Sequence, residues 1–327
     1  EEGRVFPAVH ESPLSPSTKL GGVFMFRRKE KLSVVLIAIS FLFSSTVSAE
    51  AREIQTKYPL NIVSAGFAAK LPAKPVRIIS LSPSATEIIF AINAGSQVLA
   101  VDDNSNYPAN VPTSALSGFA PNLEAIVALD PDFVILNKDS TKSDAIHKSL
   151  TNLGIPVMME EAARNLNDVY KEIRIIGKAV DQQVKARKLI VSMKKRIAKV
   201  IESSKKVKSQ SFFHELDNTL YTATSKTFIG NVYRDLGLKN VADAASGADS
   251  SGYPQLSAEY LIRSNPQIIF LADAQYGESI STVKARPGWQ SIAAVKNGRI
   301  IELPADIPSR WGPRIVDFYE LVAKSIK

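Results

Sequence analysis

One segment occurs twice in this chain, and this repetition constrains the fold more than any other feature. Residues 123–136 read LEAIVALDPDFVIL and residues 258–271 read AEYLIRSNPQIIFL. Each copy has a Glu near its start, a Pro seven positions later, and then a β-branched and aromatic run. Proline ends a helix because it lacks an N–H group and clashes with the preceding turn, and the run after it is typical of a strand covered on both faces. One helix–Pro–strand unit in each half predicts two similar α/β lobes with a ligand cleft between them.

Alternating strand and helix patterns surround both copies. We therefore predict an α/β protein with two Rossmann-like lobes joined by a long rigid helix, with the cleft between the lobes. The expected divisions are an N-terminal lobe over 50–165, a helical connector over 166–207 and a C-terminal lobe over 208–327. The connector holds no proline and keeps helical spacing of its apolar residues, and its second helix is expected to begin near Asp181. Residues 50–74 are interpreted as an extended lead-in.

One helix of the N-terminal lobe has a recognisable start. Ser84 and Glu87 have the spacing of a capping box, and Pro83 suits the first turn of a helix. We therefore expect a helix to begin at this segment, directly after a buried strand that covers 76–81.

The N-terminal region has the pattern of an export signal. Four basic residues lie between Arg27 and Lys31, an apolar run covers 32–43, and Val47 and Ala49 are small residues of the kind that signal peptidase reads. The apolar run is short for a transmembrane helix.

We interpret 25–49 as a signal peptide that is cleaved after Ala49, the alternative being an uncleaved anchor. Residues 1–24 are interpreted as an upstream non-native or mis-start segment. Cysteine is absent from the sequence, so disulfides, thiolate metal sites and a lipidated Cys are not expected. The predicted product is exported to the periplasm or cell exterior and is soluble after cleavage.

Composition and motifs argue against catalysis and against nucleic-acid binding. No nucleophile elbow, dinucleotide fingerprint, P-loop or HExxH motif occurs. After signal cleavage only His147 and His214 remain, which cannot form the closed nitrogen and sulfur site that zinc prefers. Ten Lys or Arg residues lie between Lys185 and Lys208, and we interpret them as the solvated face of a long helix. No cofactor and no metal are expected.

Polar and aromatic residues gather instead in loops at the ends of the expected strands. Aromatic faces with a few fixed polar groups suit a flat small molecule with polar edges. The candidate ligand-binding residues of these loops are Asn104, Tyr107, Gly118, Phe119, Glu215, Asp217, Tyr221, Tyr253, Arg310 and Trp311.

Several motifs together resemble the substrate-binding proteins of ABC importers, in the branch that carries cobalamin, ferric siderophores and haem. The similarity runs from about residue 75 to the C-terminus. It rests on RIISLSPSATE at 77–87, the Tyr107-Pro108 loop, NLE at 122–124, YPQLSAE at 253–259, RPGW at 286–289 and SRWGPR at 309–314.

The resemblance is nearest to the cobalamin binders, and it implies roles for particular residues. Glu124 and Glu259 would be docking carboxylates, one per lobe, that meet arginines of the permease. The cleft would be lined by Asn104, Gly118, Asn137, Tyr253 and Arg310. The implied function is capture of a corrinoid, cobalamin, as transported ligand by a monomer, and delivery to a permease homodimer with its ATPase subunits.

Two kinds of alternative remain open at the level of sequence. Asn and Gly stand at several cleft positions where cobalamin binders are rich in Trp and Tyr, so a ferric siderophore or haem is an alternative ligand. Tyr107, Tyr221, Tyr253 or His214 would then contact the ligand or its iron. An exported α/β hydrolase and a sensor without a transport role are the alternatives of other classes; under the sensor interpretation, the two glutamates are ordinary first-turn partners of the helix dipole.

Overall fold

The computed structural model describes residues 55–245, 251–304 and 306–327. The expected signal peptide, the segment upstream of it and the cleavage position lie outside these residues. Among the described residues, no helix combines the length and the apolar character needed to cross a bilayer.

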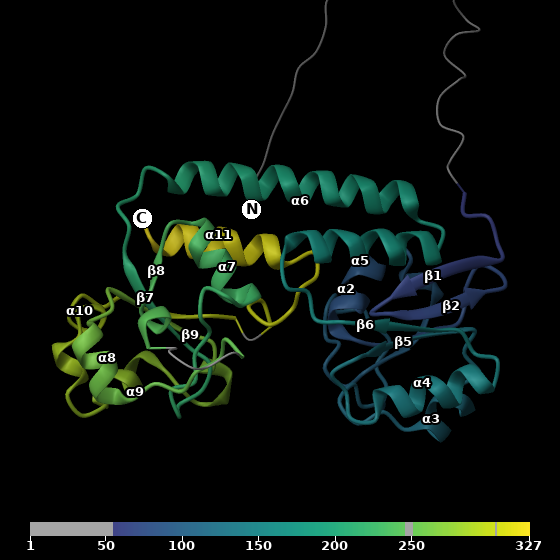
Figure 1. Ribbon diagram of the computed structural model, residues 1–327, viewed down its shortest axis with the longest axis horizontal. Helices are drawn as coiled ribbons and strands as arrows, with labels where there is room; N and C mark the ends of the chain where they lie inside the picture. The colour runs from purple at the N-terminus through teal and green to yellow at the C-terminus, as the bar shows by residue number, and fades with distance from the viewer. Residues whose placement is uncertain (1–54, 246–250, 305) are drawn as a thin grey trace, which may run out of the picture. The chain divides into compact units, whose positions relative to one another are not determined.

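Two parallel four-stranded sheets form the centres of the two lobes (Figure 1). The first has the order β4-β3-β5-β6 and the second β10-β9-β7-β8. Each lobe therefore places its first strand between its second and third, with its fourth strand beside the third, so the two sheets share one topology. The strands are β3 (Ile78–Leu81), β4 (Val98–Val101), β5 (Phe133–Asn137), β6 (Val157–Glu160), β7 (Ser211–Glu215), β8 (Lys239–Asn240), β9 (Ile268–Leu271) and β10 (Ile300–Glu302).

Helices cover both faces of each sheet, as an α/β lobe requires. In the first lobe α2 (Pro83–Ala91) and α5 (Leu166–Ala179) lie on one face, and α3 (Leu123–Ala128) and α4 (Ser143–Asn152) on the other. The second lobe has α7 (Phe228–Asp235) and α11 (Ile315–Ser325) on one face, and α8 (Ala258–Ser264), α9 (Ile280–Ala285) and α10 (Ala293–Lys296) on the other. Neighbouring residues of one strand enter different cores, as with Phe212 and Phe213.

The long helix α6 (Gln183–Ser204) links the lobes, packing on α5 and on α11 (Figure 1). One buried apolar cluster runs from Ile173 of α5 through Met193 of α6 to Phe318 of α11. The approach of α5 to α6 requires Gly177, because a Cβ there would lie 2.4 Å from the Cβ of Ala186. The fold class is thus confirmed, while the domain divisions at 165 and 207 stay an interpretation.

The repeated segment forms the same unit twice. In the first lobe α3 leads through Pro131 to β5, and in the second α8 leads through Pro266 to β9. The residue before each proline, Asp130 and Asn265, has a φ of 48°, in the left-handed region that Asp and Asn tolerate better than most residues. Both turns therefore reverse the chain in the same way.

Two local expectations were wrong. The lead-in contains an antiparallel hairpin of β1 (Leu60–Ser64) and β2 (Phe67–Leu71), whose turn uses positive φ at Ala65 and Gly66.

The capping box at the start of α2 is also absent. The N-cap is Ser82, whose hydroxyl accepts a hydrogen bond from Ala85 N, and Pro83 occupies the first turn. Ser84 lies inside the helix, and Glu87 pairs with arginines instead of reaching back to the helix start.

Candidate ligand-binding site

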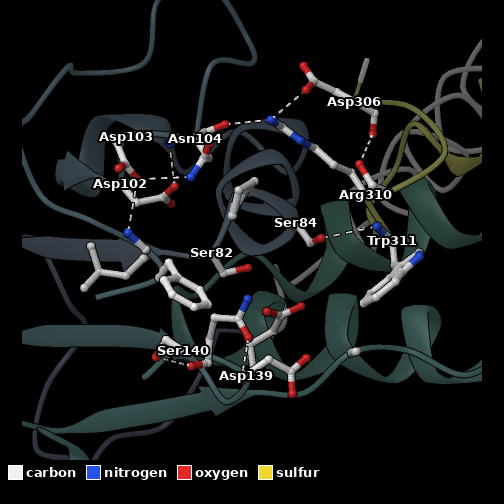
Figure 2. A pocket seen from close by; sticks show the side chains of 18 of the residues that line it. Ser82, Ser84, Asp102, Asp103, Asn104, Asp139, Ser140, Asp306, Arg310 and Trp311 are labelled. Carbon is white, nitrogen blue, oxygen red and sulfur yellow. Dashed lines mark hydrogen bonds and ion pairs between the residues drawn. The ribbon is translucent and has the colours of Figure 1, made fainter. Parts of the chain in front are cut away.

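A polar cavity of about 570 Å³ lies where the strand ends of the two lobes meet (Figure 2). All four strands of the first sheet contribute to it at their carboxyl ends, through Ser82, Asp102, Asn137 and Glu160. From the described residues of the second lobe, the segments that follow β9 and β10 contribute. The full lining comprises Leu81, Ser82, Pro83, Ser84, Asp102, Asp103, Asn104, Asn106, Gly118, Phe119, Asn137, Asp139, Ser140, Glu160, Ala162, Gln275, Tyr276, Asp306, Ser309, Arg310 and Trp311.

The structure brings six of the sequence-predicted ligand residues together at this cavity. They are Asn104, Gly118, Phe119, Asn137, Arg310 and Trp311. Gly118 packs closely on Asp102: a Cβ there would lie 3.0 Å from the carboxyl carbon of Asp102, so a larger residue would require that side chain to shift. The contact of these six residues with a ligand stays a prediction.

Arg310 lines the cavity, but its guanidinium already has protein partners (Figure 2). It donates to Asn106 Oδ1 at 2.9 Å, to the carbonyl of Asn104 at 2.6 Å and to Asp306 Oδ1 at 2.9 Å. Its side chain is 9 % exposed and also lies 3.7 Å from Glu87. The arginine therefore ties the segment after β10 to the loop after β4, and it shapes the cavity wall.

A buried carboxylate strengthens this contact between the lobes. Glu87 of α2 is 2 % exposed and accepts from Arg314 Nη2 at 2.5 Å. The Arg314 guanidinium stacks on the ring of Tyr107 at 4.2 Å, and Trp311 N donates to Ser84 Oγ at 3.2 Å. Tyr107 thus belongs to the interlobe contact, and the structure does not place it at the cavity.

The remaining candidates also lie outside the cavity lining. Glu215 is fully buried and accepts both guanidinium ends of Arg286, at 2.7 and 2.5 Å. Asp217 closes a turn by accepting from the backbone of Thr219, and Tyr221 and Tyr253 are partly exposed.

The histidines face apolar surroundings. His214 is completely buried and shares a hydrogen bond with the Tyr233 hydroxyl, and burial lowers its pKa to about 3. His147 packs against Phe67, with ring centroids 4.6 Å apart, and burial lowers its pKa as well. Within the described ranges, no three His, Cys, Asp or Glu side chains are arranged to hold a metal ion.

Acidic side chains dominate the cavity, a feature that the sequence interpretation did not draw together. Among the lining residues that the structure describes, five carry carboxyl groups, Asp102, Asp103, Asp139, Glu160 and Asp306, and one, Arg310, carries a guanidinium. Their common signal in the sequence is position: Asp102 directly follows β4, Glu160 ends β6, and Asp103 and Asp139 lie two positions after a strand.

Two of these acids are buried. Asp102 accepts from Asn104 N at 2.8 Å and from Ser105 Oγ at 2.7 Å, and burial raises its pKa although these hydrogen bonds oppose the rise. Glu160 is 4 % exposed, and burial raises its pKa to about 7. Tyr276, 81 % exposed, is a further lining residue that the sequence interpretation missed.

The two glutamates expected at the permease contact occupy matching places in the two lobes. Glu124 is an exposed first-turn residue of α3, whose N-cap is Asn122, and Glu259 is its counterpart on α8, whose N-cap is Ser257. Hydrogen bonds from its own backbone N–H and from the Ser257 hydroxyl lower the pKa of Glu259.

The sequence model of one known family, described as periplasmic binding protein, matches residues 78–307. The chain belongs to this family. A Bacillus subtilis relative, the uncharacterized ABC transporter substrate-binding lipoprotein YvrC, is 33 % identical over 261 residues, which cover 77 % of this chain and 80 % of the relative. A cobalamin-binding protein of Halobacterium salinarum is 26 % identical over 257 residues, with 76 % and 68 % covered.

Solved structures support the same assignment. The crystal structure of a possible iron-binding (periplasmic solute-binding) protein from Staphylococcus epidermidis superposes with a TM-score of 0.68 and 30 % identity, covering 78 % of this chain and 99 % of that one. The protein is therefore a substrate-binding protein of the ABC type. Because its family consists of solute-binding proteins, the hydrolase alternative is wrong.

Proposed function

We propose that this protein captures a corrinoid such as cobalamin in the interlobe cavity and delivers it to an ABC permease with its ATPase subunits. The observation that carries the ligand assignment is the charge of the cavity. Among the described residues, five carboxyl groups line it, and the one guanidinium there already donates to Asn106, to Asn104 and to Asp306. An anionic ligand would meet repulsion here without a free cation to offset it.

The chemistry of a corrinoid suits such a lining. Its rim carries neutral carboxamides, which both donate and accept hydrogen bonds, whereas haem carries two propionates. Side-chain amides and hydroxyls of Asn104, Asn137, Ser140 and Ser309 could pair with carboxamides, and carboxylates could accept from their N–H groups. The exposed ring of Phe119 adds an apolar contact for a flat macrocycle.

A ferric siderophore is the second candidate ligand. It is favoured by the structural similarity to a protein described as possibly iron-binding and by Tyr276, a phenol on the cavity that could approach iron. Against it, the residues named for iron contact, Tyr107, Tyr221, Tyr253 and His214, do not line the cavity.

Titration of the purified protein with cyanocobalamin, haemin and a ferric hydroxamate tests the assignment. We expect 1:1 binding of cyanocobalamin by calorimetry and a matching change in its visible spectrum. Phe119→Ala should weaken binding about tenfold or more, because it removes exposed aromatic area at the cavity. Tyr221→Ala is the matched control, an exposed aromatic outside the cavity, and should leave affinity unchanged. Tight binding of haemin or the ferric hydroxamate without cyanocobalamin binding would transfer the assignment to that ligand.

We further propose that Glu124 and Glu259 are the docking carboxylates. Their support is their equivalence, since each is exposed in the first turn of the helix that precedes the third strand of its sheet. Two equivalent negative points suit a homodimeric permease, which presents the same surface twice about a twofold axis.

Export is the last element of the proposal. A signal over 25–49 with cleavage after Ala49 would release a chain that begins at Glu50. The Bacillus subtilis relative is named a lipoprotein, whereas the present sequence contains no cysteine. N-terminal sequencing of exported protein should give Glu50 as the first residue; an N-terminus upstream of the apolar run would refute cleavage.

A further inference from the structure

Glu160 differs from the other acids of the cavity in its burial and in its partners. It ends β6 and is 4 % exposed, yet it belongs to the cavity lining. Burial raises the pKa of Glu160, the nearby Ser82 hydroxyl opposes this rise, and the carboxyls of Asp139 and Asp102 add to it. No ion pair joins Glu160 to a Lys or Arg among the described residues.

The basic groups on neighbouring elements do not compensate this carboxyl. Lys138, after β5, pairs with Glu161 at 3.1 Å, and Arg164 also pairs with Glu161. On α5, Glu172 is 8 % exposed and adds a further carboxyl, and one of its oxygens is buried without a partner. The other titratable groups on these neighbouring elements are Asp168, Tyr170, Lys171, Arg174 and Lys178 of α5, Lys70 of β2, and Asp144, His147 and Lys148 of α4.

A carboxylate in this position is costly. Desolvation disfavours the charged form, and each neighbouring carboxylate disfavours it further. A bound ligand would remove the water that still reaches the cavity side of Glu160, so the cost of ionisation would rise again on binding. The neutral acid can instead donate one hydrogen bond into the cavity.

We propose that Glu160 is a specificity residue of the cleft that is protonated in the ligand-bound state and donates a hydrogen bond to a carbonyl oxygen of the ligand. This inference rests on the proposed function, and it deepens it. The cavity would select ligands with a carbonyl acceptor, such as the carboxamides of a corrinoid, over ligands that present a carboxylate beside Asp102 and Asp139. Capture above neutral pH then takes up a proton from the solvent.

Calorimetry with cyanocobalamin measures this proton uptake directly. At pH 8, titrations in phosphate and in Tris should differ in enthalpy because a proton is taken up, and Kd should rise by up to about tenfold for each pH unit above the pKa of Glu160 in the free protein. Glu160→Gln keeps a donor at the same place, so it should bind within a few-fold of the parent at pH 7, with no uptake and a flat pH profile. Glu161→Gln, the neighbouring partly exposed acid, is the control and should keep the parent's pH dependence. Equal proton uptake in Glu160→Gln and the parent would overturn the assignment.

Infrared difference spectroscopy tests the proton without a ligand. The parent minus Glu160→Gln spectrum at pH 6 should contain the C=O stretch of a protonated carboxylic acid, and this band should disappear as pH rises through about 7. A carboxylate band at pH 6 would refute a raised pKa of Glu160 in the free protein, independently of any ligand. Failure of cyanocobalamin to bind either protein at any pH would refute the corrinoid assignment instead, so the two failures are distinguishable.

Discussion

The two lobes share one strand order, but the residues at the carboxyl ends of their strands have different roles. In the first lobe all four strand ends supply cavity residues, and the buried Glu160 has no basic partner among the described residues. In the second lobe, within the residues that the structure describes, only the segments after β9 and β10 reach the cavity, and the buried Glu215 at the end of β7 is held by Arg286. The same fold thus provides an open polar surface in one lobe and a closed ion pair in the other.

This difference separates what topology determines from what side chains determine. Parallel sheets place strand ends along one edge, where ligands bind. Whether that edge is available depends on whether its polar groups are already satisfied. Arg286 satisfies Glu215 and Glu278 and stacks on Trp289 at 4.5 Å, so that edge of the second lobe has a structural role.

The largest expected effect concerns Glu124 and Glu259, which occupy matching positions in the two lobes. If Glu124 and Glu259 each contact one permease subunit, Glu124→Arg with Glu259→Arg should abolish ligand transport in reconstituted vesicles. Removing one partner of a close interfacial charge pair costs about 2–5 kcal/mol. Because the positions are equivalent, each single variant should reduce transport to a similar extent.

A ligand titration of the free double variant is the control for the cavity and should match the parent. The matched surface control is Glu202→Arg, an exposed acid of α6 far along the chain from both repeats, which should transport normally. Normal transport by the double variant would mean that the two glutamates act only as first-turn residues of their helices.

The next effect uses the contrast between the two buried acids. Arg286→Leu leaves the fully buried Glu215 without its cation and should lower the free energy of unfolding by about 3–5 kcal/mol in urea denaturation. Adding Glu215→Met should recover most of the loss, because the unpaired charge is removed as well. A double variant no more stable than Arg286→Leu would contradict this account.

In contrast to Arg286→Leu, Glu160→Gln should not lower the free energy of unfolding at alkaline pH. The pKa of Glu160 is raised from 4.5 to about 7, so the folded state binds more protons than the unfolded state between these values. The parent's stability should therefore fall as pH rises from about 4.5 to 7 and level off above 7, with a contribution on the order of 1–3 kcal/mol from this group. The variant should lack this contribution and equal or exceed the parent's stability at pH 8. A Glu160→Gln protein that is less stable than the parent at pH 8 would show that the carboxylate is stabilising.

Sequence patterns predicted the repeated units and the α/β class because both depend on local spacing. The helix–Pro–strand unit is marked by Pro131 and Pro266, and burial on both faces gives the strands their apolar runs. Five of the six cavity residues found in advance lie in loops that follow strands, and the sixth, Asn137, ends β5. The role of Arg310 could not be predicted, because its acceptors Asn104 and Asn106 are about 200 positions away. Glu160 was missed for a similar reason. Whether a cation lies near it depends on several elements that are distant in sequence and pack together only in the fold.

The smallest expected effect tests whether the two lobes are equivalent at the level of single hydrogen bonds. Asn122 Oδ1 accepts from Ala125 N at 3.1 Å at the start of α3, and Ser257 Oγ accepts from Tyr260 N at 3.1 Å at the start of α8. Both caps are exposed, so Asn122→Ala and Ser257→Ala should each lower the free energy of unfolding by about 1 kcal/mol, measured by urea denaturation.

The buried cap of α7 provides the reference for these two. Thr227 Oγ1 accepts from Gly230 N at 3.0 Å and also donates to the carbonyl of Thr224, in a residue that is 7 % exposed. Thr227→Ala should therefore cost more than either exposed cap, because two buried backbone groups lose a partner that water replaces poorly. Equal costs at Asn122 and Ser257 would support matched helix starts beneath the two proposed docking glutamates. If the loss in the free energy of unfolding at one of these two caps approaches the loss for Thr227→Ala, the two helix starts are not equivalent.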